Sequence, residues 1–234
     1  MARPTLVVGA RKGATQGMLA VVVADGELAP EDAELARRAD LVIAADGGAR
    51  WLDAQGVRPD VLVGDLDSLE EASVTRLQAA GTRVSRHPVD KDASDTELAV
   101  EAAIAAGADR VVVLGALGGG RLDHELANVA LLVDRVTAGV DLRLQRGATR
   151  VRAVRADRSI EIEAEVGAIV TLLPIGGDAV GVSTTGLQYP LRDEILVMGR
   201  SRGLSNVVSG APASVSLRAG SLLVIEIDST KEGE

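Results

Sequence analysis

Short apolar runs alternate with helical segments through the first 140 residues of the chain. Strands are expected at Thr5–Val8, Leu19–Val23, Leu41–Ala44, Val61–Val63, Arg83–Arg86 and Arg110–Leu114. The helical segments between them are Pro30–Arg38, Gly48–Gln55, Leu69–Ala80, Asp95–Ala106 and Asp123–Thr137. Three of these segments are followed by Gly, a frequent helix stop. Strand–helix alternation of this kind predicts an N-terminal α/β domain with a mostly parallel sheet.

The pattern changes near residue 140, where the helical segments stop. Short β runs then follow one another at intervals of about ten residues, from Leu142–Gln145 to Leu222–Ile227, with Gly and Pro between them. That spacing is typical of an antiparallel sandwich. We therefore expect an α/β domain over residues 1–140 and an all-β antiparallel sandwich domain over residues 141–234, with a frayed tail at Lys231–Glu234.

Composition narrows the classes of function. The chain is 47% hydrophobic but only 1% aromatic, so its core is expected to consist of Val, Leu, Ile and Ala. The net charge of −9 argues against binding to nucleic acid or to an anionic membrane surface. The absence of Cys excludes thiolate catalysis, and two His residues are too few for a His-built metal site. No apolar run is long enough to cross a bilayer, so we expect a soluble, cytoplasmic protein.

Two acidic loops follow expected strands, at the sheet edge where open α/β folds bind ligands. In Ala45-Asp46-Gly47-Gly48 the glycines let the backbone approach a ligand, and helix capping by Asp46 is the alternative. Gly64-Asp65-Leu66-Asp67-Ser68 carries two carboxylates at i and i+2, which point to the same side of an extended backbone. They repel one another unless a hard divalent cation binds them. Helix capping by Asp67 or Ser68 is again the alternative.

Two further loops add basic residues. Ser94-x-x-Glu97 is a capping box, which places Lys91, Asp92 and Asp95 at a helix N-terminus, either as a ligand site or as a solvated charge cluster. Lys91 is a point charge suited to phosphate. The Gly-rich turn Gly115–Gly120 leads into Arg121-Leu122-Asp123-His124 and resembles an anion cradle, in which Arg121 can fork onto phosphate oxygens. His124 alone is better explained by packing or capping.

Together the four loops hold six acids and two basic residues. Acids for a metal ion and bases for phosphate are what phosphoryl-type transfer requires, because positioning and charge neutralisation do most of its catalysis. No Cys or His nucleophile is apparent beside them. The acids are Asp46, Asp65, Asp67, Asp92, Asp95 and Asp123, and the basic residues are Lys91 and Arg121.

These loops, in this order and spacing, resemble the thiamine pyrophosphokinase family over roughly residues 40–130. In the second half, Ser183–Leu191 and Gly203-Leu204-Ser205-Asn206 resemble that family's thiamine-binding β-domain. The resemblance implies a Mg²⁺-dependent transfer of diphosphate from ATP to thiamine, which gives thiamine diphosphate and AMP. It also implies a homodimer, in which the partner's β-domain completes each active site.

The resemblance further implies roles for individual residues. Mg²⁺ is expected at Asp65, Asp67, Asp92 and Asp95, and the catalytic residues at Asp67, Asp92, Asp95, Lys91 and Arg121. ATP is expected to contact Asp46, Ser68, Lys91, Arg121, Asp123 and His124. Thiamine is expected to contact Asp95, Tyr189, Ser205 and Asn206. Ser94 stands where many members carry Thr, which preserves the hydroxyl.

Three other functions stay open at this point. A pyrophosphokinase for another small alcohol, such as a hydroxymethylpterin, would share the donor site. A nucleotide- or thiamine-binding module without turnover would not need every carboxylate. A metal-dependent phosphohydrolase would release phosphate without any acceptor. The Ser205-Asn206 segment favours thiamine among these.

Overall fold

The computed structural model describes residues 17–228. The strand expected at Thr5–Val8 and the tail at Lys231–Glu234 lie outside the described residues. The chain divides into two compact units, Met1–Gly147 and Ala148–Glu234.

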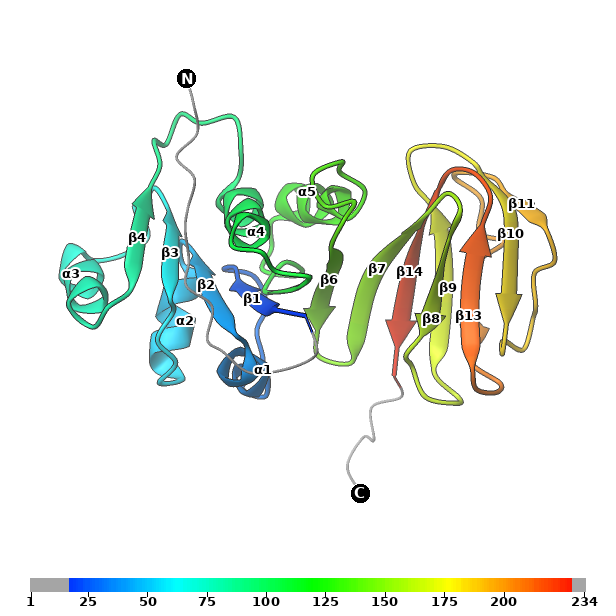
Figure 1. The fold of residues 1–234 in the computed structure, drawn as a ribbon, viewed down its shortest axis with the longest axis horizontal. Helices are drawn as coiled ribbons and strands as arrows, with labels where there is room; N and C mark the ends of the chain where they lie inside the picture. The colour runs from blue at the N-terminus through cyan, green and yellow to red at the C-terminus, as the bar shows by residue number, and fades with distance from the viewer. Residues whose placement is uncertain (1–16, 229–234) are drawn as a thin grey trace. The chain divides into compact units, whose positions relative to one another are not determined.

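The first unit is built on a parallel sheet whose described strands follow the order β6-β5-β1-β2-β3-β4 (Figure 1). β1, β2, β3 and β5 are almost entirely buried on both faces, which explains why they are continuous apolar runs without alternation. The predicted parallel α/β domain is confirmed. The strands are β1 Leu19–Val23, β2 Leu41–Ala45, β3 Val61–Gly64, β4 Arg83–Arg86, β5 Arg110–Leu114 and β6 Asp141–Arg146.

Helices cover both faces of this sheet. The helices α1 Asp32–Arg38, α2 Gly48–Ala54 and α3 Glu71–Ala79 share one apolar core with the strands. On the other face, α4 Asp95–Ala105 packs on β1, β2, β3 and β5, and its buried residues include Ala99 and Ala103. Because interiors are close-packed, these small side chains allow a short distance between α4 and the sheet. No helix within residues 17–228 is long and apolar enough to cross a membrane.

Two elements differ from the sequence-based expectation. The helix expected at Asp123–Thr137 is wrong at its C-terminal end, because α5 spans Leu122–Leu131. Thr137 Oγ1 donates to the carbonyl oxygens of Leu131 and Asp134, and such side-chain bonds replace helical ones with turns. The run at Leu142–Gln145, expected in the antiparallel half, is β6, which pairs in parallel with β5. The division between the units therefore falls at Gly147, beyond the expected residue 140.

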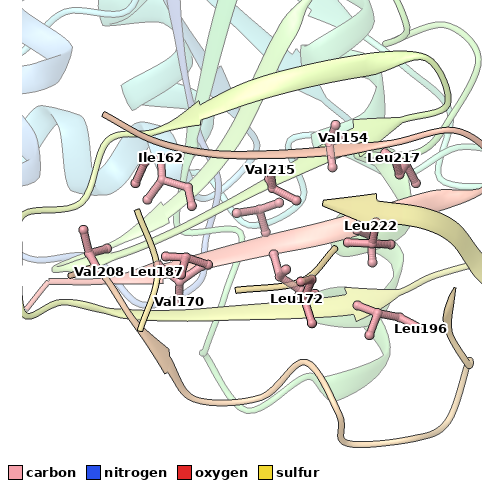
Figure 2. Packing of buried hydrophobic residues seen from close by; sticks show 14 of the residues in the cluster. Val154, Ile162, Val170, Leu172, Leu187, Leu196, Val208, Val215, Leu217 and Leu222 are labelled. Atoms are coloured by element: carbon pink, nitrogen blue, oxygen red, sulfur yellow. The ribbon is translucent and has the colours of Figure 1, made fainter. Parts of the chain in front are cut away.

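The second unit is all antiparallel. One sheet has the order β12-β9-β14-β7 and the other β11-β10-β13-β8. Leu172 and Leu222 of the first sheet and Val215 and Leu196 of the second belong to one core of aliphatic side chains (Figure 2). The predicted sandwich is confirmed. The strands are β7 Thr149–Arg155, β8 Arg158–Ile162, β9 Ile169–Pro174, β10 Ala179–Thr185, β11 Glu194–Leu196, β12 Asn206–Val207, β13 Ala213–Leu217 and β14 Ser221–Ile227.

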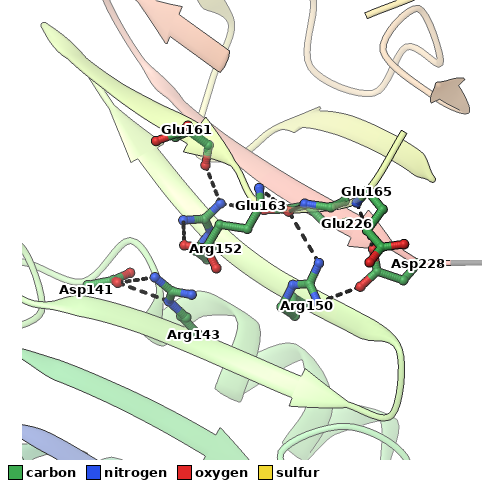
Figure 3. A network of polar contacts seen from close by, with 10 residues as sticks. Asp141, Arg143, Arg150, Arg152, Glu161, Glu163, Glu165, Glu226 and Asp228 are labelled. Carbon is green, nitrogen blue, oxygen red and sulfur yellow. Dashed lines mark hydrogen bonds and ion pairs between the residues drawn. The ribbon is translucent and has the colours of Figure 1, made fainter. Parts of the chain in front are cut away.

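A charged network crosses the second unit (Figure 3). Glu226 on β14 is fully buried, and its Oε2 accepts the backbone N–H groups of Glu163 and Ala164 at 2.8 Å. Arg152 donates to the other oxygen of this carboxylate, and Arg150 lies 3.6 Å from Oε2. A buried carboxylate that is paired and hydrogen-bonded in this way fixes the connection after β8 against β14.

Candidate active site

The carboxyl ends of the parallel strands meet at one edge of the sheet in the first unit. The sheet order places β2, β3 and β4 on one side of β1 and β5 and β6 on the other. Ligands of open parallel sheets bind where the order reverses in this way. A cleft of about 380 Å³ lies at this edge, lined by the loops after β1, β2 and β5 and by the start of α4.

Glycines let these loops approach one another closely. A Cβ on Gly26 would lie 2.3 Å from the carbonyl oxygen of Gly115, which no side chain tolerates. Gly64 ends β3 with a φ of 148°, and a Cβ there would lie 3.2 Å from both Asp46 and Asp95. The glycines therefore bring charged residues of separate loops together.

Three carboxylates gather at this edge. One oxygen each from Asp46, Asp65 and Asp67 lies within 4.8 Å of the other two. Asp46 Oδ1 is buried and has no hydrogen-bond partner among the described residues. Burial raises the pKa of the Asp46 carboxyl, and the nearby Ser68 hydroxyl offsets this only in part. Crowded carboxylate oxygens with an unused lone pair fit a hard divalent cation.

Asp65 and Asp67 converge through a turn, whereas the sequence suggested an extended backbone. Leu66 between them has a φ of 66°, and its side chain is buried in the core. The Asp67 N–H donates to Asp65 Oδ1 at 3.2 Å, and this bond is the largest cause of the lowered pKa of Asp65. Left-handed backbone at a bulky residue is strained, and such strain concentrates at functional sites.

Lys91 connects two of the loops. Its Nζ lies 3.2 Å from Asp65 Oδ2 and 3.1 Å from Asp95 Oδ1. Burial alone would lower the pKa of Lys91, but the neighbouring carboxylates of Asp95 and Asp65 outweigh this effect, and the pKa of Lys91 is raised. Asp95 begins α4 directly after Ser94, whose Oγ accepts the N–H of Glu97 as expected for an N-cap.

The Gly-rich loop leads directly into α5. Arg121 and Asp123 pair through two hydrogen bonds of 2.9 and 2.6 Å, and both side chains are exposed. The Arg121 guanidinium holds the pKa of Asp123 well below its usual range. Asn128 is buried and donates to the carbonyl oxygen of Ala116 at 2.8 Å, which fixes α5 to the loop.

The expected residues of the first unit fall into three groups. Asp65 and Asp67 approach Asp46, and Ser68 lies next to that triad. Asp92 and Asp123 are exposed and do not line the cleft. The residues that do line it are Asp46, Lys91, Asp95, Arg121 and His124.

Asp25, Glu125 and Asn128 are among the residues that line the cleft without having been expected from the sequence. Asp25 follows β1 as the other acids follow their strands, so the same rule for loops after parallel strands would have found it. Glu125 and Asn128 lie four and seven residues after Arg121, a spacing that puts all three on one helix face.

In the second unit, the residues expected to bind thiamine come together. The buried side chain of Asn206 accepts the backbone N–H of Tyr189 at 3.0 Å and donates to the Tyr189 carbonyl oxygen at 2.7 Å. Tyr189 is 57% exposed, and Ser205 is exposed with a φ of 54°. Asn206 therefore holds the loop of Tyr189 in place and leaves the other two side chains accessible.

Both units match models of known protein families. Residues 33–144 match the model described as thiamin pyrophosphokinase, catalytic domain, and residues 158–222 match that described as thiamin pyrophosphokinase, vitamin B1 binding domain. The chain belongs to the thiamine pyrophosphokinase family. The resemblance of the loops is thereby confirmed, and the activity is that of a thiamine diphosphokinase.

Individual thiamine pyrophosphokinases are similar over most of their length. Thiamine pyrophosphokinase 3 of Oryza sativa subsp. japonica is 30% identical over 214 residues, covering 80% of this chain and 78% of the relative. The enzyme of Bacillus subtilis is 26% identical over 185 residues, covering 79% and 86%. Its crystal structure superposes with a TM-score of 0.79 over 90% of this chain and 99% of that chain. The similarity thus extends through both units.

Proposed function

We propose that the chain transfers the terminal diphosphate of ATP to the hydroxyl of thiamine, at the cleft of the first unit, with release of AMP. The observation that carries this proposal is the triad of Asp46, Asp65 and Asp67 beside a cleft that Lys91 and Arg121 line. This combination of acids and cations suits phosphoryl-type transfer, in which charge neutralisation and positioning supply most of the catalysis.

Asp46, Asp65 and Asp67 would hold Mg²⁺, for which their crowded oxygens and the unpartnered Asp46 Oδ1 are the support. The resemblance placed Asp92 and Asp95 at the metal as well, but neither belongs to the cluster of Asp46, Asp65 and Asp67, and Asp95 pairs with Lys91. When bound, the ion neutralises polyphosphate charge and orients it. The acidic cleft requires such a cation because its own carboxylates would otherwise repel the nucleotide.

Arg121 and Lys91 are proposed to hold the phosphates. The Arg121–Asp123 pair is exposed, so it contributes little stability, and the guanidinium can exchange Asp123 for phosphate oxygens. Arg121 and Asp123 lie at the start of α5, and a helix N-terminus favours anions. Ser68, Asp123 and His124 remain proposed contacts of ATP on the ground of the family resemblance.

The transfer requires one new bond and one broken bond. The thiamine hydroxyl oxygen bonds to the β-phosphorus, and the bond from this phosphorus to the bridging oxygen of AMP breaks, so AMP leaves with the electron pair. The hydroxyl proton must go to a base late in the transfer. Asp95 is the better candidate for that base, because it lines the cleft and Asp92 does not.

Tyr189, Ser205 and Asn206 are proposed to form the thiamine site, and a homodimer is proposed to present it. The support for a dimer is an exposed apolar stretch at the edge strand β11, formed by Ile195, Val197 and Met198. Such patches mark interfaces, and a two-fold dimer is the commonest solution. Light scattering should give twice 24.1 kDa, and a fully active monomer would contradict this part. The cytoplasmic location stays a prediction.

Chromatography of a reaction with thiamine, ATP and Mg²⁺ tests the proposal. AMP and thiamine diphosphate should appear in equal amounts, and AMP should not form when thiamine is left out. ADP with thiamine monophosphate would contradict the transfer of a diphosphate unit. Phosphate release without thiamine would instead indicate a hydrolase.

A further inference from the structure

Lys91 occupies a place between two carboxylates that come from different parts of the sheet edge. Asp65 follows β3 and Asp95 begins α4, and the Lys91 Nζ lies 3.2 and 3.1 Å from one oxygen of each. The side chains of Lys91 and Asp65 are each only 14% exposed. An ion pair at this depth is screened far less than a surface pair, so the ammonium is a fixed charge of the site.

The metal triad and Lys91 share one residue. Asp65 contributes an oxygen to the cluster with Asp46 and Asp67, and its Oδ2 also faces Lys91. Asp95 stands outside the triad, and its Oδ1, which has no hydrogen-bond partner among the described residues, lies 3.1 Å from the Lys91 Nζ. A carboxylate shared between neighbouring cations is the usual arrangement of two-metal sites, where the ions lie about 3.5–4 Å apart. Here the neighbour of Asp65 outside the triad is the Lys91 ammonium group.

We propose that Lys91 is a resident cation that takes the place of a second protein-bound divalent metal. The chain then binds a single metal ion before the nucleotide arrives, at Asp46, Asp65 and Asp67. Without Lys91, Asp65 and Asp95 are left as half-buried carboxylates facing one another, and a hard divalent cation is what such a pair attracts. The inference rests on the metal site under the proposed function.

The test counts bound Mn²⁺ in the absence of nucleotide, by electron paramagnetic resonance of the free ion during a titration. Wild-type protein should bind one Mn²⁺ per chain. Lys91→Met should bind two, and Lys91→Gln should agree with it, which guards against a folding defect of either variant. Lys91→Arg keeps the charge and should stay at one. The double variant Lys91→Met with Asp95→Asn should return to one, because it removes a ligand of the second position.

Arg86→Met is the matched control. Arg86 pairs with Glu71 at 2.7 Å, outside the residues that line the cleft, so loss of this cation should leave the count at one. A count that stays at one in Lys91→Met, with tighter binding, would show that Lys91 competes for the same place as the metal and would overturn the inference. Two ions in the wild type would overturn it as well. If the wild type binds no ion, the proposed metal site itself is wrong. The proposed reaction is tested separately, by the synthesis of thiamine diphosphate.

Discussion

Arg50 and Asp25 form an ion pair of 3.2 Å that ties α2 to the loop after β1. The same guanidinium donates through Nη1 to the carbonyl oxygen of Ser68 at 2.9 Å. Arg50 thus connects an acid that lines the cleft to the loop of Asp65 and Asp67, although Arg50 itself does not line the cleft. We infer that it positions the metal-binding loop.

Replacement of Arg50 by Ala is expected to lower kcat by about tenfold, which corresponds to a rise of about 1.4 kcal/mol in the activation barrier. The melting temperature should change little, because exposed ion pairs contribute only about 0–1 kcal/mol to stability. Steady-state kinetics and thermal unfolding check this. Arg76→Ala is the control, since Arg76 pairs with Asp53 at 2.7 Å at similar exposure but away from the cleft. Equal loss of kcat in both variants would contradict a positioning role for Arg50.

Asp67→Asn should leave the fold intact and reduce kcat by at least about 10²-fold, the scale for loss of a group that stabilises charge in the transition state. The amide keeps the shape of the side chain and removes the charge that a metal requires. Circular dichroism and product formation at saturating Mg²⁺ are the measurements. Asp92→Asn, which alters an exposed acid outside the triad, should stay close to wild type. Near-normal turnover of Asp67→Asn would show that Asp67 is not a metal ligand.

Gly64→Ala is expected to reduce activity by about tenfold or more. The new methyl group would lie 3.2 Å from Asp46 and Asp95, at a φ that L residues rarely adopt. Kinetics of the purified variant provide the measurement. Gly56→Ala separates strain from crowding, because Gly56 also has a positive φ of 65° but has nothing within 4 Å of an added Cβ. Its activity should be unchanged.

Arg152→Leu should destabilise the protein by about 3 kcal/mol, because it leaves the fully buried Glu226 with a weaker partner. Urea unfolding with a fitted m-value measures the change. Arg202→Leu removes a surface partner of Glu194 at 3.1 Å and should cost less than about 1 kcal/mol. If the two variants unfold at the same urea concentration, Glu226 does not depend on Arg152.

The order of elements could be predicted because β1, β2, β3 and β5 are mostly apolar runs and Ser94 marks the start of α4. The end of α5 could not, since Thr137 and Asp134 terminate it through bonds to the backbone that periodicity does not reveal. The parallel pairing of β6 is equally invisible, because strand direction depends on a partner far away in sequence.

The site shows a similar division. The residues that follow strands could be placed at one edge by topology alone, which located Asp46, Asp65 and Asp67. The left-handed turn at Leu66 and the position of Lys91 between Asp65 and Asp95 depend on how the loops pack in three dimensions. The family resemblance placed Asp95 at the metal, and only the structure reveals that Asp95 Oδ1 lies 3.1 Å from the Lys91 Nζ.

Two buried alanines of α4 determine how closely this helix packs on the sheet, and therefore where its first residue, Asp95, lies. Ala99 and Ala103 are fully buried, and the helix that carries them begins at Asp95, beside Gly64 and Lys91. Because interiors are close-packed, a methylene group added at either alanine would push the helix outward and carry Asp95 with it. The small size of Ala99 and Ala103 thus fixes the distance between α4 and the sheet, and with it the position of Asp95 relative to the carboxylates at the sheet edge.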